Sequence, residues 1–226
     1  MKKNLVLSLL LLTTAFGLNA KADTITEPEG VHVCEKQPSL MCDANEKPFT
    51  GNLTEKTSEG VLRGTSVFKN GRPDGVLKTF YSNGKVETET TFKNGKQEGV
   101  AKGYWQDGKL KAEITFVNGK QTGMVKAYWE NGKLMAEGKQ NGGIPDGVQK
   151  TYYKNGKLMH ETTFKNGKKN GKYAKYFENG QVEVEGSYDN DMPDGVTKTY
   201  NKNGKVLKEV TYNKGEIVSQ KENGKK

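Results

Sequence analysis

The stretch GVLKTFYSNGKVETETTFKNGKQE, residues 75–98, is the unit from which most of this chain is built. Steps of 24 residues from the first glycine reach the same residue type with no insertion or deletion, at Gly75, Gly99, Gly123, Gly147, Gly171 and Gly195. A first turn pair, Asn83-Gly84, and a second turn pair, Asn94-Gly95, recur in the same phase. Self-similarity at a period of this length indicates a repeat architecture.

An Asn-Gly pair between two runs of alternating residues predicts a two-residue type I′ turn, because both central positions need φ > 0. Each unit is therefore expected to fold into a β-hairpin. With Asn83-Gly84 as the turn, Tyr81 faces Val86, and the pairing of every residue farther from the turn follows.

The charges in the repeats test this pairing, since it places Lys78 opposite Glu89. In later units the same rule pairs Lys102, Lys126, Lys150 and Lys198 with Glu113, Glu137, Glu161 and Glu209. Only Ala174, opposite Glu185, interrupts the pattern. Directly opposed unlike charges contribute about 0.2 to 1 kcal/mol per pair. The pattern thus favours this register over a slip by one residue, which would exchange the two faces.

Alternation along the strands sorts the side chains to two faces. One face is expected to be apolar, with Tyr81, Trp105, Trp129, Tyr153 and Phe177 opposite Val86, Leu110, Leu134, Leu158 and Val182. The other carries the Lys–Glu pairs and a second aromatic row that begins at Phe80. We expect part of this second face to be a recognition surface, made of Tyr104, Tyr128, Tyr152, Tyr176, Tyr200, Lys102, Lys126 and Lys150.

The predicted fold class is all-β, an elongated single-layer antiparallel meander of tandem 24-residue β-hairpin repeats. Only 32% of the residues are hydrophobic, which is lean for a globular core. A meander explains this composition because each repeat contacts only its neighbours. Closure into a barrel is the alternative, and nothing in the sequence indicates where the first and last strands of a barrel would pair.

Residues 1–22 are typical of a secretory signal peptide. Lys2 and Lys3 precede an apolar run at residues 5–12, and Ala20-Lys21-Ala22 fits an A-x-A cleavage site. A retained N-terminal anchor is the alternative, although the run is too short to span a bilayer. We therefore expect export, to a periplasmic, cell-surface or extracellular location.

Residues 23–50 lack the repeat and are expected to form an irregular leader or cap. An even number of cysteines in an exported chain predicts a disulfide between Cys34 and Cys42. A metal or redox pair is a weaker alternative, because the spacing is not CxxC and His32 is the nearby histidine.

The remaining boundaries follow from the repeat. Terminal units of an array are usually atypical, because one side meets solvent or a cap. The expected segments are a degenerate first repeat at 51–74, six repeats at 75–218 and a polar C-terminal tail at 219–226.

The formal net charge of +9 invites a nucleic-acid function. That function is disfavoured, because Lys alternates with Glu within the units and a signal peptide directs the chain away from nucleic acid. The lysines that follow the turns do form two basic rows, Lys85, Lys109, Lys133, Lys157 and Lys205 after the first turn and Lys96, Lys120 and Lys168 after the second. Such rows can attract anionic lipid or acidic polysaccharide, although solvated turn residues are the simpler interpretation.

Residues typical of catalysis are scarce. His32 and His160 are the only histidines, and His160 occupies a position that varies between units. The sequence contains no Ser/His/Asp set, nucleophile elbow, zinc-ligand spacing or phosphate-binding loop. We expect a protein that is not an enzyme and that needs no cofactor or metal.

The repeated elements Y-x-x-N-G-K and E-x-x-F-x-N-G-K resemble the variant MORN repeat, MORN-2, of bacterial proteins often labelled YwqK-type antitoxins. The resemblance covers residues 51–215. It implies an antiparallel sheet of consecutive hairpins that acts as a binding scaffold. The expected function is thus an exported, non-enzymatic scaffold for a protein or cell-surface partner, including contact with a host cell. A toxin–antitoxin component is one alternative, and carbohydrate binding is another, although Trp105 and Trp129 are the only tryptophans.

Overall fold

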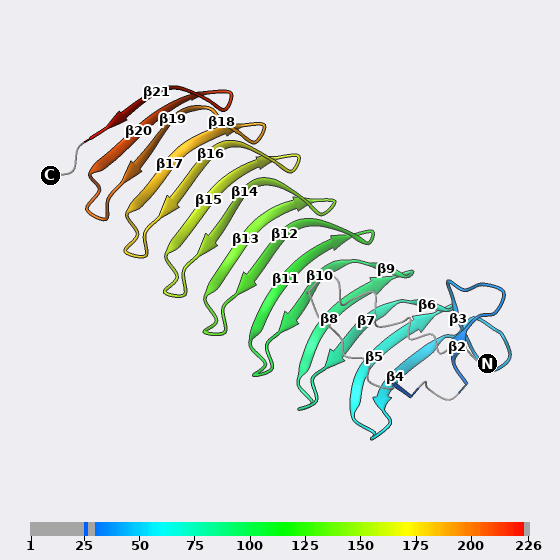
Figure 1. The fold of residues 1–226 in the computed structure, drawn as a ribbon. Coiled ribbons are helices and arrows are strands. Elements are labelled where there is room, and N and C mark those ends of the chain that lie inside the picture. Colours follow the sequence, from blue (N-terminus) through cyan, green and yellow to red (C-terminus); the bar gives the residue numbers. More distant parts are fainter. Residues whose placement is uncertain (1–24, 27–29, 224–226) are drawn as a thin grey trace. The chain divides into compact units, whose positions relative to one another are not determined.

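The computed structural model describes residues 25–26 and 30–223 (Figure 1). The predicted signal peptide, residues 1–22, lies outside the described residues. The chain divides into two compact units, Met1–Gly119 (unit 1) and Lys120–Lys226 (unit 2). Every regular element in the described part is a strand, so it offers no helix that could cross a membrane.

Unit 1 contains a short two-stranded sheet and a larger antiparallel sheet, in which β1 pairs with β4 and each later hairpin pairs with the next. Its strands are β1 (Ile25–Thr26), β2 (His32–Val33), β3 (Met41–Cys42), β4 (Gly51–Thr57), β5 (Leu62–Lys69), β6 (Arg72–Pro73), β7 (Gly75–Phe80), β8 (Val86–Lys93), β9 (Lys96–Gln97), β10 (Gly99–Tyr104) and β11 (Leu110–Val117). Hence the degenerate repeat, residues 51–74, folds into the same hairpin as the regular ones.

Unit 2 is a single antiparallel meander in sequence order. Its strands are β12 (Lys120–Tyr128), β13 (Leu134–Asn141), β14 (Ile144–Tyr152), β15 (Leu158–Lys165), β16 (Lys168–Tyr176), β17 (Val182–Asp189), β18 (Met192–Pro193), β19 (Gly195–Tyr200), β20 (Val206–Asn213) and β21 (Glu216–Glu222). The predicted all-β meander of tandem hairpins is confirmed. The predicted tail begins too early, because β21 pairs with β20 as far as Glu222.

The second turns have the predicted type I′ geometry. In the first regular unit φ is +50° at Asn94 and +80° at Gly95. Both turn residues have positive φ in the other second turns too, including Asn190-Asp191, where an aspartate stands in place of glycine.

The first turns do not have the predicted geometry. Of the pair Asn83-Gly84, only Gly84 has positive φ. The Tyr81 amide donates to the Lys85 carbonyl and the Gly84 amide donates to the Tyr81 carbonyl, each at 2.9 Å. These bonds define a three-residue loop with glycine in the left-handed region. Consequently Tyr81 faces Lys85, and the predicted pairing of Tyr81 with Val86 is wrong.

A β-bulge compensates for the longer loop. Phe80 lies opposite Val86 but Thr79 lies opposite Thr88, so that Glu87 is the extra residue. The same shift recurs in every other unit. It places the second aromatic row, not the first, opposite the Val and Leu row, and it restores the predicted register beyond the bulge.

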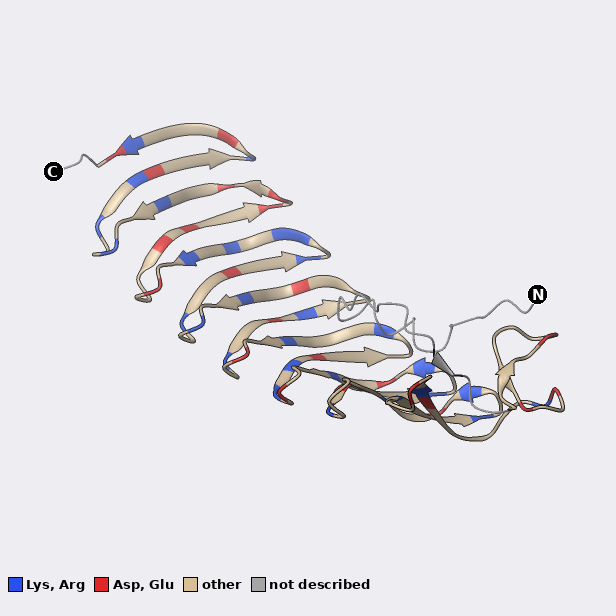
Figure 2. Ribbon diagram, turned by 60° about the horizontal axis from the view of Figure 1, so that its bottom comes forward, with Lys and Arg blue, Asp and Glu red and all other residues tan. Residues whose placement is uncertain are grey.

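The predicted Lys–Glu pairs therefore face one another. Lys78 lies opposite Glu89 and Lys126 opposite Glu137, and Ala174 lies opposite Glu185. Blue and red segments alternate between neighbouring strands in Figure 2. On the other face of unit 1 the side chains of Leu77, Ala101, Ile114 and Phe116 are buried.

The register between neighbouring hairpins changes by two residues between the second turn and the strand pairing that follows it. The first glycine of each unit lies at this change and permits the backbone conformation that it needs. In β17, Asp189 pairs with Met192 and Glu185 pairs with Lys198, with Gly195 at φ +83° between them. Ser219 stands at the corresponding place in β21. There the shift is a single residue, which puts Lys221 opposite Glu209. The two-residue shift of the other units would have put Glu222 opposite Glu209.

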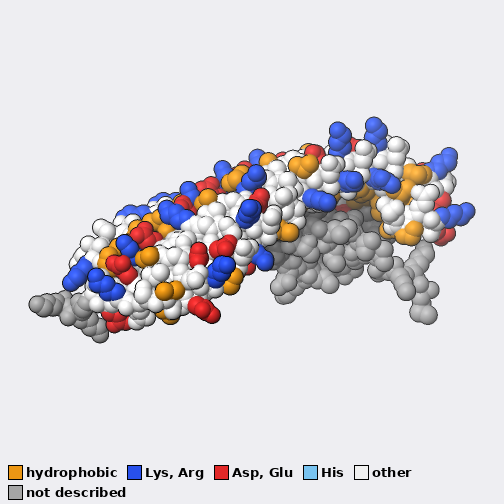
Figure 3. All heavy atoms as spheres, turned by 90° about the horizontal axis from the view of Figure 1, so that it is seen from above, with side chains coloured by type: hydrophobic (Ala, Val, Ile, Leu, Met, Phe, Trp, Pro, Cys, Tyr) orange, Lys and Arg blue, Asp and Glu red, His pale blue; other side chains and the backbone are white. Residues whose placement is uncertain are grey.

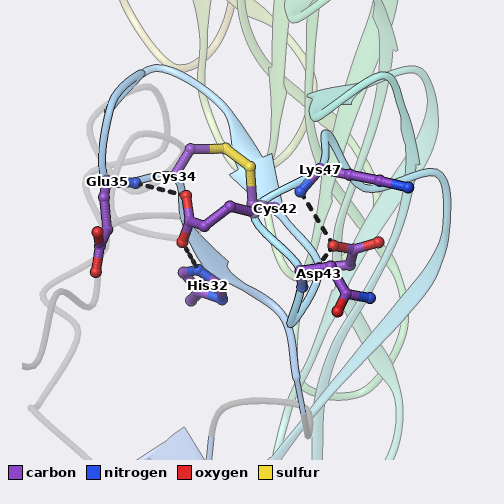
Figure 4. Close-up of polar contacts among 8 residues, drawn as sticks. His32, Cys34, Glu35, Cys42, Asp43 and Lys47 are labelled. Carbon is purple, nitrogen blue, oxygen red and sulfur yellow. Dashed lines mark hydrogen bonds and ion pairs between the residues drawn. A yellow bond between two sulfur atoms is a disulfide. The ribbon is translucent and has the colours of Figure 1, made fainter.

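Residues 30–50 form a cap, which a disulfide between Cys34 and Cys42 closes (Figure 4). Both cysteines are buried with Leu40. The Met41 amide donates to the Gly71 carbonyl at 2.8 Å, and the Gly71 amide donates to the Phe49 carbonyl at 2.7 Å. The cap is thus docked on the second turn of the first hairpin.

Candidate functional site

The face that carries the Lys–Glu pairs, called the ladder face, holds a column of alternating charge. Glutamates lie between two lysines, one on each neighbouring strand: Glu89 faces Lys78 and Lys102, and Glu137 faces Lys126 and Lys150. Each unlike neighbour penalises a slip of that strand, so the column fixes register along the sheet.

The ion pairs themselves are ordinary surface pairs. Lys78 Nζ lies 3.2 Å from Glu89 and Lys150 Nζ lies 3.6 Å from Glu161, with lysine side chains more than a third exposed. Exposed pairs contribute about 0 to 1 kcal/mol each. The column therefore matters more for strand register than for the free energy of unfolding.

The fifth regular repeat rearranges this column. Ala174 takes the lysine position and lies between Glu161 and Glu185. The missing cation is replaced two residues earlier on the strand, where Lys172 Nζ lies 3.4 Å from Glu161. The repeat therefore keeps one positive charge beside Glu161, but this charge lies closer to the second turn.

The predicted tyrosine row lies on the ladder face, and two of its hydroxyls bond within the sheet. The Tyr152 hydroxyl donates to Glu137 at 2.7 Å, and the Tyr200 hydroxyl donates to Glu185 at 2.5 Å. Burial, then the Glu137 bond, raises the pKa of Tyr152 to about 12. The Glu185 bond, then burial, raises the pKa of Tyr200 to about 12. These tyrosines stay neutral at physiological pH.

The other predicted members of the surface lie beside them. Tyr104, Tyr128 and Tyr176 are half-buried, as are Lys102, Lys126 and Lys150. The structure brings all eight predicted residues to the same face, in the unit to which each belongs.

An exposed apolar row on the same face was missed in the sequence. It occupies the position two residues before each ladder lysine, at Val76, Val100, Met124, Val148 and Val196. Val148 is 45% exposed and Val196 is 47% exposed. The sequence signal that could have revealed this row is an aliphatic side chain that recurs every 24 residues on the face expected to be polar and exposed to solvent. Lys172 interrupts the row.

The first-turn lysines are structural rather than simply solvated. Lys85 Nζ donates to the Asp107 carbonyl in the next first turn at 2.7 Å, and its aliphatic chain lies over Gly108. Lys133 and Lys157 make the same contact with Asn155 and Asn179. These three lysines therefore connect successive repeats, which weakens the interpretation of their row as an open anion-binding row.

The first aromatic row has a similar role. The Tyr81 hydroxyl donates to the Tyr104 carbonyl at 2.6 Å, and the Tyr153 hydroxyl donates to the Tyr176 carbonyl at 2.7 Å. Trp129 Nε1 donates to the Tyr152 carbonyl at 3.1 Å. These three polar tips bond to carbonyls 23 residues along the chain, so these side chains join successive repeats.

Groups suited to chemistry are not gathered in the described part of the chain. His160 Nδ1 lies 3.2 Å from Thr151 Oγ1, and burial, followed by the charge of Lys175, lowers the pKa of His160. No set of three metal-ligating side chains occurs among the residues described. The features that repeat are surfaces, not reactive clusters.

Comparison with protein families gives one match. The family described as MORN repeat variant matches residues 73–94, 97–118, 121–139, 145–166, 169–190 and 193–214. These six segments cover more than half of the chain and follow its hairpin phase. The degenerate hairpin at 51–72 lies outside them. A search of curated proteins found no match.

Proposed function

The chain belongs to the MORN repeat variant family, and on that premise we propose that it is an exported, non-enzymatic scaffold that binds a protein or cell-surface component through its ladder face. Repeat proteins of this kind present extended surfaces on which successive units add contacts. The partner is expected to span several repeats, because each repeat offers the same small patch.

The exposed apolar row is the observation that carries this proposal. Val100 is 46% exposed beside the Lys–Glu pairs of unit 1, and Val148 is 45% exposed at the equivalent position of a repeat in unit 2. Aliphatic side chains rimmed by charge and flanked by aromatic rings are typical of protein interfaces. Contacts repeated along one chain add affinity through effective concentration.

Two features support export. Residues 1–22 have the pattern of a signal peptide, and Cys34 and Cys42 form a disulfide, which persists in oxidising compartments. These features favour a periplasmic or surface partner, including a host-cell component, over the cytoplasmic toxin that the YwqK-type label would imply.

A crosslinking pull-down with the exported protein tests the proposal. The variant Val100→Thr/Val148→Thr keeps β-branched side chains but makes the row polar, and capture of a specific partner is expected to fall several-fold. Ile144→Thr is the matched control, because Ile144 is 51% exposed on the same strand as Val148 but lies beside the second turn. Equal capture by all variants would contradict the ladder-face proposal, and recovery of a cytoplasmic toxin would favour the antitoxin alternative.

A further inference from the structure

The second turns form an edge that is held by hydrogen bonds from the turn amides, both to backbone carbonyls and to side-chain acceptors such as Thr50, which accepts from the Asn70 amide. In unit 1 the Gly71, Gly95 and Gly119 amides donate to the carbonyls of Phe49, Pro73 and Gln97 at 2.7 to 2.8 Å. Each bond spans 22 residues and joins one second turn to the preceding segment. The side chains of the residues that directly flank these turns take no part in these bonds.

Beside the first two second turns of unit 1 those side chains are all basic. Lys69 and Arg72 flank the turn Asn70-Gly71 as direct partners, and Lys93 and Lys96 flank the next second turn in the same way. All four are exposed. Figure 3 shows Lys and Arg side chains among the exposed side chains of the described residues.

No ion pair compensates these four charges among the described residues. Two carboxylates lie nearby in sequence, Asp74 and Glu98, and Glu98 accepts a hydrogen bond from the Asn118 amide at 2.9 Å. Like charges on directly opposed residues destabilise a pair of strands. The sheet thus carries an electrostatic cost here that an anionic ligand would relieve.

The same edge in unit 2 has a different character. The residues after its second turns include Ile144 and Met192, both exposed, and the last turn is followed by Glu216. Lys165 and Lys168 flank one turn of this edge as partners, but its neighbours are not basic. Unit 2 therefore supplies a single pair of opposed lysines, with no basic pair at the neighbouring second turns, for comparison with the two basic pairs of unit 1.

We propose that the second-turn edge of unit 1 binds a linear acidic polysaccharide through Lys69, Arg72, Lys93 and Lys96. Corresponding positions on successive hairpins lie roughly 10 Å apart, so the two basic pairs follow a line that a polymer chain can track. The turn residues between them are Asn and Gly, which offer no apolar side chain for insertion into a bilayer. The disulfide favours an extracytoplasmic polymer over nucleic acid.

The test measures binding of the exported protein to dextran sulfate, with uncharged dextran and anionic phospholipid vesicles as parallel probes. The variant Lys69→Gln/Lys93→Gln is expected to weaken dextran sulfate binding roughly tenfold at low salt and to flatten the salt dependence of Kd, because fewer counterions are released. Lys165→Gln/Lys168→Gln removes the same number of charges in unit 2 and should change Kd by less than about threefold. Asp74→Asn should strengthen binding.

Three results would overturn the inference. They are equal losses in the unit 1 and unit 2 variants, binding to vesicles but not to the polymer, and binding that does not change with salt concentration. Urea unfolding of each variant excludes misfolding as the cause. Val100→Thr/Val148→Thr should leave dextran sulfate binding unchanged, so that failure here and failure of the ladder-face proposal remain distinguishable.

Discussion

The two turn edges use the same Asn-Gly dipeptide for different physical reasons. At the second turns Asn is present for its backbone, since Asn94 and Asn166 take positive φ, which asparagine tolerates better than most residues. At the first turns Asn is present for its side chain. Asn131 Oδ1 accepts from the Lys133 amide at 3.0 Å, and its Nδ2 donates to the Lys154 carbonyl in the next first turn at 2.9 Å.

This difference extends to how each edge joins successive hairpins. The first-turn edge is joined by side chains of Asn, Lys and Tyr. The second-turn edge is joined mainly by backbone amides of the turn residues, which donate to carbonyls and to a few side-chain oxygens such as that of Thr50. Substitutions that remove side chains should therefore weaken the first edge, and substitutions that disturb backbone conformation should weaken the second.

The largest expected effect is on the second edge, at the cap. Gly71 has φ +76°, and an added Cβ would lie 2.8 Å from the Met41 carbonyl oxygen. Gly71→Ala should therefore lower the free energy of unfolding by about 3 kcal/mol, as backbone strain combines with loss of the cap contact. Urea denaturation measures this change.

The first edge supplies the control. Gly84 has φ +80°, but an added Cβ there would meet nothing within 4 Å. Gly84→Ala should cost only the left-handed conformation, about 1 kcal/mol. Equal costs at the two glycines would show that close contact with the cap contributes nothing.

A smaller effect separates the two roles of asparagine. Asn131→Gly removes two side-chain hydrogen bonds and should lower the free energy of unfolding by about 1 kcal/mol. Asn166→Gly keeps the backbone conformation, φ +51°, and should change it by less than about 0.5 kcal/mol. Thermal unfolding of the two variants decides between them, and the reverse order would refute the distinction.

The repeat, the hairpins and the Lys–Glu register could all be predicted from the sequence, because each depends on periodicity and on unlike charges facing one another. The first-turn geometry could not. The dipeptide signal is the same for both turn types, and the prediction reached the right distant register only because the bulge at Glu87 cancels the extra loop residue. In this protein the strand register beyond the bulge therefore does not reveal which type of turn connects the two strands.

The candidate surface could be predicted only in part. Alternation placed Tyr152 and Lys150 on one face, but nothing local indicates that the Tyr152 hydroxyl bonds to Glu137 on the neighbouring strand. Likewise the sequence alone indicates only that Lys85 follows a turn. The structure shows that its amine donates to a carbonyl of the next hairpin. Contacts between repeats depend on the pairing of units, which the pattern within one unit does not contain.

The pH dependence of stability tests a contact on the ladder face. Because the pKa of Tyr200 is about 12 in the folded protein and about 10 in an unfolded chain, folding favours the neutral phenol. This contribution is complete below pH 10 and is lost as the pH rises from about 10 to 12. Tyr200→Phe should show a shallower fall of melting temperature across that range, whereas identical profiles would mean that the Glu185 bond has no effect.

The smallest effect is a gain on the first edge. Tyr153 and Phe177 occupy equivalent positions, but only tyrosine can donate to the carbonyl 23 residues later, as Tyr153 does to Tyr176 at 2.7 Å. Phe177→Tyr should add the corresponding bond to the Tyr200 carbonyl and raise the free energy of unfolding by about 0.5 to 1 kcal/mol. Tyr153→Phe is the matched loss and should lower it by a similar amount. If unfolding of the two variants changes in the same direction, the aromatic row acts through packing alone, and the side-chain connection of the first edge reduces to its Asn and Lys contacts.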